Sequence, residues 1–443
     1  MRATHRLAAG LALLLALPVV AQQPGAREVP LQAAAPTFDA PTAAPAPPAA
    51  AEGESSEITA TVVTFGPGEQ VWERFGHNAL WIHDGSRGTD IAWNWGLFDF
   101  AQPDFLQRFL SGDTKYWMAG EDAYRMIAAY HEMGRTITLQ RLALTQQQAA
   151  ALRDFVQWNS LDQNKYYRYD YFRDNCSTRL RDAIDRVLGG ALQRATDTVT
   201  TALTYRGESV RLTDGLLPVQ LGIDVALGRP ADRPLTEWQS FFIPMRMRDA
   251  LRSVTVPSAD GTPTPLVIDQ RTIPPTSGPT VTVPTEPPIL VLRYLLLGVL
   301  LAVLAFVLRV LGRSNRGALW GLVLLGMLWS LLCGVIGVLL LYMWGFTRHV
   351  FWGWNEHLLL LSPFSLALVI LLPAALLRGR AVRAARAMSG VIALLGVLAL
   401  VLGMIPGGQS SLPVVALALP LHLALAWSLS RPVPEPPIRQ GSP

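Results

Sequence analysis

The sequence predicts an α+β domain over residues 57–255, followed by an α-helical membrane domain over 289–430. Two observations carry this prediction. Charged residues are frequent before residue 289, whereas long uncharged apolar runs fill the chain after it. Within 57–255, β-branched residues alternating with polar ones give way repeatedly to helical spacing. A segment of about 200 residues is long enough to bury a core of its own.

The N-terminus has the features of an export signal. Arg2 and Arg6 precede the apolar run 7–20, and small residues follow. This pattern predicts a signal peptide over 1–21, cleaved after Ala21, with an uncleaved signal anchor as the alternative. Residues 22–56 are dominated by Ala and Pro and are predicted to form a disordered leader. In either case the domain that follows is exported.

The predicted domain contains strands and helices in mixed order. Four segments have strand character, namely 58–65, 79–83, 90–95 and 135–142. Three are predicted as helices, namely 121–132, 145–159 with Thr145 as its cap, and 175–188. The last of these ends at Gly189-Gly190, where a left-handed C-cap forms easily.

Five apolar segments after residue 288 predict membrane helices. They are 289–311, 318–344, 357–377, 388–405 and 412–429. Each is close to the roughly 20 residues that a helix needs to cross a bilayer. The Pro/Thr-rich stretch 256–288 is predicted to be an extended spacer between the two domains.

Arginines predict the orientation of these helices. The loops 345–356 and 406–411 carry only Arg348, whereas the alternate turns and the end of the last helix are basic through Arg309, Arg313, Arg316, Arg378, Arg380, Arg383, Arg386 and Arg431. By the positive-inside rule the tail 431–443 is cytoplasmic, and five spans then place residues 57–255 in the periplasm. We therefore predict a multi-pass protein of the bacterial inner membrane.

The charge balance excludes one class of partner. Residues 57–288 contain 27 acidic and 23 basic side chains, so the formal charge of +4 does not come from this part. Nucleic acid is therefore not predicted as a ligand. The sequence contains no motif for a metal site or a nucleotide-binding loop, and no cofactor is expected.

Cys176 is the candidate nucleophile. The second cysteine, Cys333, lies inside an apolar segment, so a disulfide is not expected in this exported protein. Cys176 follows Asn175, a good N-cap, and the N–H groups and dipole of a helix start favour a thiolate. The alternative is a buried core thiol, because Leu180 and Ile184 share its helical face. A negative charge on Asp174 would also oppose a thiolate.

His77 is the candidate base. Residues 57–255 contain three histidines, of which His131 lies in a predicted helix and is interpreted as structural. His77 and His83 flank a predicted strand, and Gly76 permits a tight turn beside His77. Asn94, on the following strand, is the leading candidate for a third residue that orients the imidazole.

Other polar residues are candidates for substrate binding. Glu69 and Glu73 precede His77 and are suited to contact a substrate amine. The loop 346–357 combines aromatic and polar groups at the start of a predicted span, where polar groups are costly, so we expect it to contact a lipid headgroup or a lipoprotein. The alternative is that Trp352 and Trp354 serve only as interfacial anchors, their ordinary role at a membrane boundary. The remaining candidates are Asn175, Ser177, Arg179, His349, Asn355 and Glu356.

Three sequence blocks, "FGPGEQVWERFGHNALWI", "WNWGLFDF" and "YDYFRDNCSTRLRD", resemble the Lnb-type lipoprotein N-acyltransferase periplasmic-domain family over residues 57–250. The resemblance implies a papain-like fold in permuted order, similar to the lecithin retinol acyltransferase relatives, with Cys176 as nucleophile and His77 as base. It implies N-acylation of diacylglyceryl lipoproteins through a Cys176 thioester. It leaves the third residue open, and the acyl donor is either a membrane phospholipid or the lipoprotein's own ester.

Two other functions compete with this interpretation. Papain-like domains in the envelope are often cysteine amidases or peptidases of cell-wall peptides, although five membrane spans suit lipid substrates better. A membrane-tethered binding module without catalysis is the second alternative. In such a module Cys176 and His77 would serve only the stability of the domain.

Overall fold

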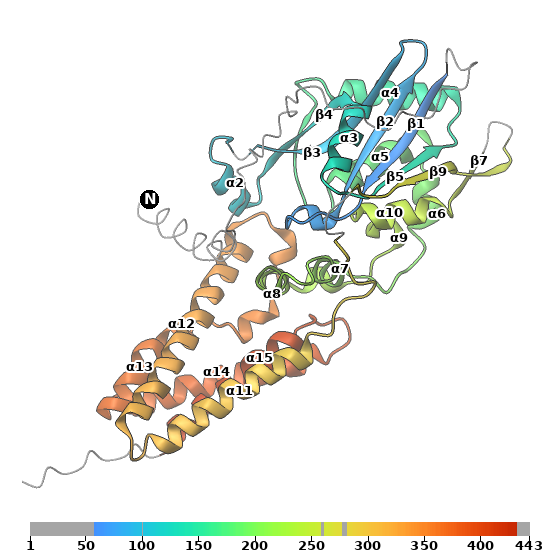
Figure 1. Ribbon diagram of the computed structural model, residues 1–443. Coiled ribbons are helices and arrows are strands. Elements are labelled where there is room, and N and C mark those ends of the chain that lie inside the picture. The colour runs from blue at the N-terminus through green and yellow to red at the C-terminus, as the bar shows by residue number, and fades with distance from the viewer. Residues whose placement is uncertain (1–56, 100, 258–260, 277–280, 432–443) are drawn as a thin grey trace, which may run out of the picture.

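The computed structural model describes residues 57–99, 101–257, 261–276 and 281–431. The predicted signal peptide 1–21, the leader 22–56 and all but the first residue of the tail 431–443 lie outside the described residues. A domain of strands and helices forms one end of the described chain, and a bundle of apolar helices forms the other (Figure 1). The mixed α+β class of the N-terminal domain is therefore confirmed.

The domain is built on a seven-stranded antiparallel sheet with the order β6-β4-β3-β2-β1-β5-β9. All four predicted strands are present. The strand β4 was not predicted, because its last two residues were assigned to the predicted helix 121–132. The strands are β1 (Ile58–Phe65), β2 (His77–Asp84), β3 (Thr89–Leu97), β4 (Lys115–Asp122), β5 (Ile137–Leu142), β6 (Tyr166–Arg168) and β9 (Val267–Ile273).

Helices cover both faces of this sheet, because its strands alternate buried side chains between two cores. Val62 and Leu80 join the core that contains Leu152 of α4 (Gln146–Asn159) and Leu180 of α5 (Cys176–Val187). On the opposite face, Phe65 packs with the residues of α3 (Ala123–Glu132). The sheet therefore holds α5 against one face and α3 against the other (Figure 1).

The predicted helix signals hold in the structure. Thr145 accepts a hydrogen bond from the Gln148 N–H in a capping box at the start of α4. Gly189 and Gly190, which end α5, have φ angles of 61° and 83°, the left-handed values that favour glycine. The short helices that follow were not predicted: α6 (Ala191–Thr196), α7 (Tyr205–Leu212), α8 (Leu217–Ala226), α9 (Glu237–Ser240) and α10 (Pro244–Leu251). A further short helix, α2 (Phe105–Ser111), precedes β4.

Part of the predicted spacer 256–288 belongs to the domain instead. Residues of β9 pair with β5 along its outer edge, from Ile273 opposite Ile137 to Val267 opposite Leu142. The backbone groups of β5 would otherwise form an open sheet edge, and β9 satisfies them. Upstream of β9, β7 (Thr255–Pro257) and β8 (Pro263–Pro265) form a two-stranded ribbon.

The C-terminal region contains α11 (Val291–Leu311), α12 (Arg316–Phe346), α13 (Ser365–Arg378), α14 (Val382–Gly403) and α15 (Leu412–Ser430). Within the described residues, four of these are long and apolar enough to cross a membrane, whereas α13 has 14 residues. The predicted span 357–377 is not one continuous helix: it begins as the 3-10 turn η4 (Glu356–Leu359). Pro363 explains the break, because it lacks an N–H and disfavours helical geometry at the residue before it.

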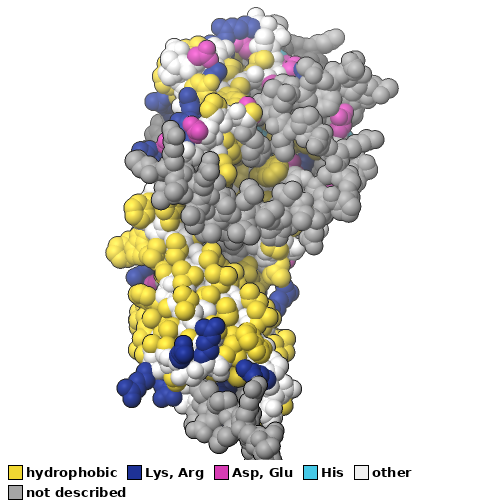
Figure 2. All heavy atoms as spheres, turned by 90° about the vertical axis from the view of Figure 1, so that its left-hand side faces the viewer, with side chains coloured by type: hydrophobic (Ala, Val, Ile, Leu, Met, Phe, Trp, Pro, Cys, Tyr) yellow, Lys and Arg dark blue, Asp and Glu magenta, His cyan; other side chains and the backbone are white. Residues whose placement is uncertain are grey.

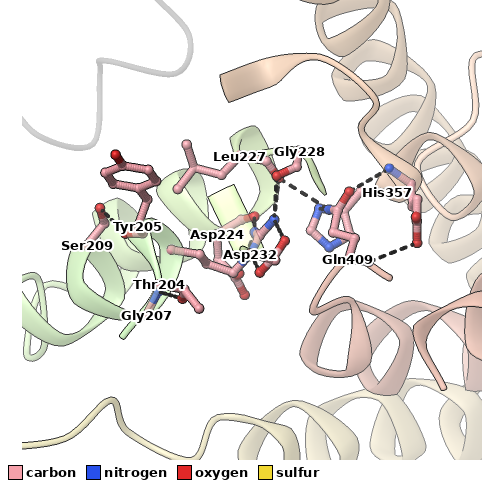
Figure 3. A network of polar contacts seen from close by, with 12 residues as sticks. Thr204, Tyr205, Gly207, Ser209, Asp224, Leu227, Gly228, Asp232, His357 and Gln409 are labelled. Atoms are coloured by element: carbon pink, nitrogen blue, oxygen red, sulfur yellow. Dashed lines mark hydrogen bonds and ion pairs between the residues drawn. The ribbon is translucent and has the colours of Figure 1, made fainter. Parts of the chain in front are cut away.

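A buried polar network joins the sheet domain to the membrane helices (Figure 3). Arg206 of α7 pairs with Asp224 at 2.9 Å and with Asp232 at 2.8 Å, and also donates to the carbonyl of Leu227. The same carbonyl accepts from Gln409, which lies between α14 and α15 and also contacts Asn355 and His357. The network fixes α8 against the loop that follows α12.

Arg206→Ala should lower the free energy of unfolding by about 3–5 kcal/mol, because it leaves two buried carboxylates without their partner. Arg194→Ala is the matched control: that exposed guanidinium donates to the Gly189 carbonyl and to no other group among the described residues. The control should change stability by less than about 0.5 kcal/mol. Thermal unfolding of the full chain in detergent measures both, and equal transition temperatures for the two variants would contradict the role given to Arg206.

Candidate active site

Two neighbouring central strands, β2 and β3, and the start of one helix carry the predicted catalytic residues. His77 is the first residue of β2, Asn94 lies on β3 and Cys176 is the first residue of α5. Because Ala79 lies opposite Asn94, the side chains of His77 and Asn94 are diagonal neighbours on one face. His77 Nε2 lies 3.0 Å from Asn94 Oδ1.

Asn78 docks the start of α5 on β2. Its side-chain Nδ2 donates to Ser177 Oγ at 3.0 Å, and its Oδ1 accepts from Thr64 Oγ1 at 2.8 Å. The backbone N–H of Asn78 hydrogen bonds to the sulfur of Cys176. The thiol therefore lies against the peptide unit that links His77 to the rest of β2.

A glycine permits β3 to approach the same helix start. Gly96 has a φ angle of +90°, and a Cβ atom at this position would lie 3.4 Å from the Cβ of Cys176. Gly76, immediately before His77, has a φ angle of +76°, in keeping with the tight turn predicted there. A side chain at residue 76 would also collide with the sulfur of Met245. Both glycines thus shape the backbone around Cys176 and His77.

Burial sets the protonation of the pair. Desolvation lowers the pKa of His77 to about 4, although the hydrogen bond that His77 donates to Asn94 acts to raise it. Desolvation raises the pKa of Cys176 to about 11, although the backbone N–H groups of Asn78, Ser177 and Cys176 itself favour the anion. With these pKa values the thiol and the imidazole are both neutral near pH 7, whereas the helix start was expected to favour a thiolate. Desolvation outweighs the helix dipole here.

Asn94 has a fixed orientation. Its Nδ2 donates to Glu121 Oε1 at 3.1 Å, which turns its Oδ1 toward His77. The Nε2–H of a neutral His77 then donates to Asn94, and Nδ1 is left as the basic nitrogen. Asn94 is 2 % exposed, so this arrangement is shielded from water. Burial also raises the pKa of Glu121, a residue that sequence reasoning placed in a helix rather than beside the site.

Aromatic rings form the wall behind His77. The rings of His77 and Tyr130 lie nearly parallel, at 4°, with centroids 6.1 Å apart. Tyr130 in turn stacks on Phe65 with centroids 3.8 Å apart. No motif marked Tyr130, because its place beside His77 depends on how α3 packs on the sheet. The wall accounts for much of the desolvation of the imidazole.

The polar neighbours of Cys176 are engaged in holding the helix start. Asn175 caps α5 by accepting from the N–H groups of Ser177 and Thr178, and it donates to the carbonyl of Phe242. Ser177 is buried and donates to the carbonyl of Phe241. Asn175 and Ser177 thus hold the helix start in place, and the substrate binding expected of them stays a prediction.

The neighbouring charges are also paired. Arg179 binds Asp174 through two hydrogen bonds, with 2.8 Å between Arg179 Nη2 and Asp174 Oδ2. Its guanidinium also lies over the ring of Tyr167, 3.7 Å from the centroid. The pairing with Arg179 offsets the negative charge of Asp174 that we expected to oppose a thiolate.

The two glutamates before His77 differ in their contacts. Glu69 is exposed to solvent. The Glu73 carboxylate accepts from the backbone N–H of Gln70 at 3.1 Å and lies 3.9 Å from Arg135, so it folds the loop 66–76 onto the domain. Of the two, Glu69 has the side chain that an incoming amine can reach.

The loop after α12 contacts the sheet domain. His349 Nε2 lies 3.0 Å from the Phe109 carbonyl, and its ring stacks on Tyr171, five residues before Cys176. Asn355 donates to the carbonyls of α8, and Glu356 bonds through backbone and side chain to Gln409. Asn355 and Glu356 therefore belong to the network that joins the two domains, whereas His349 lies toward the segment that carries Cys176.

The remaining histidines of the domain have other partners. His83 pairs with Asp90 at 3.0 Å, and His131 Nε2 lies 3.1 Å from the carbonyl of Pro274, after β9. Over the described residues, no group of three or more His, Cys, Asp or Glu side chains is arranged to hold a metal ion.

Fold and site together define a membrane protein whose α+β domain carries a cysteine, a histidine and an asparagine on two neighbouring strands and the helix start docked on them. Residues 50–207 match the family described as the Lnb N-terminal periplasmic domain, which confirms the resemblance seen in the sequence. The matched range includes His77, Asn94 and Cys176. Comparisons with curated proteins and with solved structures find no match.

The neutral pair predicts the pH dependence of Cys176 alkylation. Iodoacetamide reacts with thiolate, and a pKa raised to about 11 leaves roughly one part in ten thousand as thiolate at pH 7. The rate in a Cys333→Ala background should therefore be low at pH 7 and rise about tenfold per pH unit up to pH 10. A plateau between pH 5 and 8 would reveal a thiolate–imidazolium pair and contradict the neutral resting state.

Proposed function

We propose that the protein is a membrane-anchored cysteine acyltransferase that N-acylates the N-terminal cysteine of bacterial lipoproteins. The observation that carries the proposal is that the sulfur of Cys176, at a helix start, interacts with the backbone N–H of Asn78, the residue after His77, while buried Asn94 orients the His77 imidazole within an Lnb-type domain. A helix bearing the nucleophile, packed on an antiparallel sheet bearing the base, supports a papain-like domain in permuted order.

The membrane arrangement supports a periplasmic site. Successive helices from α11 to α15 run in alternating directions (Figure 1). Lys and Arg side chains gather at the end of the apolar belt far from the sheet domain (Figure 2). By the positive-inside rule this basic end is cytoplasmic. The fifth crossing runs from η4 through α13, and only residues 365–378 of it form an α-helix.

Acylation begins from the neutral pair. His77 Nδ1 takes the proton from Cys176 as the sulfur attacks the carbonyl carbon of a fatty-acyl ester. The backbone N–H groups around the sulfur stabilise the charge that develops during attack. The tetrahedral intermediate collapses by breaking the ester C–O bond, and the imidazolium returns its proton to the departing alcohol. A thioester on Cys176 and a lyso-lipid result.

Transfer completes the cycle. The neutral α-amine of a diacylglyceryl cysteine attacks the thioester carbonyl, and the C–S bond breaks to give an amide. The proton lost by the amine passes through His77 to the thiolate, which restores the neutral pair. An exposed carboxylate such as Glu69 is suited to attract a lipoprotein terminus that carries a protonated amine.

The test uses lipoproteins from cells that lack any other N-acylating enzyme. With wild-type protein, mass spectrometry should show N-acylated lipoprotein termini. Cys176→Ala should abolish this product, and His77→Ala should slow its formation by roughly 10²–10⁴-fold. His83→Ala is the matched control, since His83 lies on the same strand but pairs with Asp90, and it should retain activity.

The competing functions give different results in this test. Full product formation by Cys176→Ala and His77→Ala, with loss of stability alone, would support a binding module. Failure of the wild type to N-acylate, together with cleavage of soluble peptidoglycan fragments, would support an amidase.

A further inference from the structure

A groove with a volume of about 420 Å³ lies between the sheet domain and the end of α12. This volume is within the range of about 300–1,000 Å³ that small-molecule sites occupy. Its lining combines positive charge with tryptophan, and comes from the segment before α5, the turn after α8 and the loop after α12. The residues that matter here are Arg173, Arg233, Arg348, His349, Trp344 and Trp354.

Two of the arginines have no carboxylate partner within the part of the chain that the structure describes. Arg173 and Arg233 are exposed and take part in none of the ion pairs found there, although the Arg173 guanidinium lies 4.8 Å from the ring centroid of Phe351. Arg348 is paired with Asp113 at 3.0 Å. The groove thus holds a net positive charge, which favours an anionic ligand.

The tryptophans place the groove at the level of a bilayer surface. Trp344 lies in the last turn of α12, and its ring is 5.3 Å from that of Trp354, which is 69 % exposed. Tryptophan is enriched where the hydrocarbon region meets the headgroups. A ligand in this groove therefore has the apolar belt on one side and the arginines on the other.

The groove also adjoins the segment that carries the nucleophile. Arg173 is three residues before Cys176, and the intervening residues lead directly into α5. Tyr171 stacks on His349, and Phe172 packs edge-on against Phe351 with centroids 4.7 Å apart. A molecule held by Arg173 is thus held by the same short segment that positions the thiol.

We propose that this groove binds the phosphate-bearing headgroup of a membrane phospholipid, with Arg173 and Arg233 as the phosphate ligands. Guanidinium groups bind phosphate oxygens through charge-assisted hydrogen bonds, and basic groups at the membrane surface select anionic lipid. The proposal rests on the proposed acyl transfer, in which the bound phospholipid is the acyl donor. A diacylglyceryl lipoprotein carries no phosphate at the glycerol, so these arginines would not favour it as donor.

Calorimetric titration of the full chain in detergent tests the binding without turnover. The protein carries Cys176→Ala, and the probe is dihexanoyl phosphatidylglycerol. We expect saturable binding that becomes about tenfold or more weaker in Arg173→Glu/Arg233→Glu. Arg252→Glu, an exposed arginine at the end of α10 with no ion pair in the described part of the chain, should bind as the parent does.

Comparison ligands make the test specific. Dihexanoylglycerol, which lacks the phosphate, and inorganic phosphate, which lacks the chains, should both bind at least about tenfold more weakly than the phospholipid. Equal binding by the parent and the double variant, no saturable binding by the parent, or equal binding of either comparison ligand would overturn the proposal. Thermal unfolding should show that the double variant is folded, and Arg173→Ala and Arg233→Ala provide milder substitutions. Because no acyl transfer is measured, these results stand apart from the lipoprotein test.

Discussion

The docking of the start of α5 on β2 is the constraint on which the site depends. Asn78 makes this contact from both its side chain and its backbone, through Ser177 Oγ and the sulfur of Cys176. Because Asn78 follows His77 directly, the same strand sets the place of the proposed base and of the proposed nucleophile. Gly96 lets the neighbouring strand approach the same point, and that strand also supplies Asn94. Three short elements thus suffice to define the site.

Burial decides how this site can work. A helix start and three backbone N–H groups favour a thiolate, yet desolvation raises the pKa of Cys176 and lowers that of His77, so both are neutral at rest. Attack then requires proton transfer from sulfur to imidazole when a substrate carbonyl arrives. A neutral thiol is also less prone to oxidation than a thiolate. Anchoring by apolar helices supplies the lipid substrates that the same site is proposed to use.

Local patterns predicted the elements that carry the site, and tertiary contacts determined the rest. Alternation identified β2 and β3, and Asn175 marked the start of α5. The helix α7 was not predicted, because buried charges such as Arg206 interrupt its apolar spacing. The neutral pair could not be predicted, because it depends on rings such as Tyr130 that only folding brings near His77. Pro363 was a signal in the sequence for the break before α13. The apolar composition of 357–377 nevertheless led to the prediction of one continuous helix.

The central claim is that the sulfur of Cys176 accepts an acyl chain from lipid. Intact-protein mass spectrometry after incubation of the purified full chain with a phospholipid of known chain length measures this directly. The account predicts a mass increase of one acyl group, released by hydroxylamine as a thioester is and missing in Cys176→Ala. An unmodified wild-type protein, or an adduct that persists in Cys176→Ala, would contradict it.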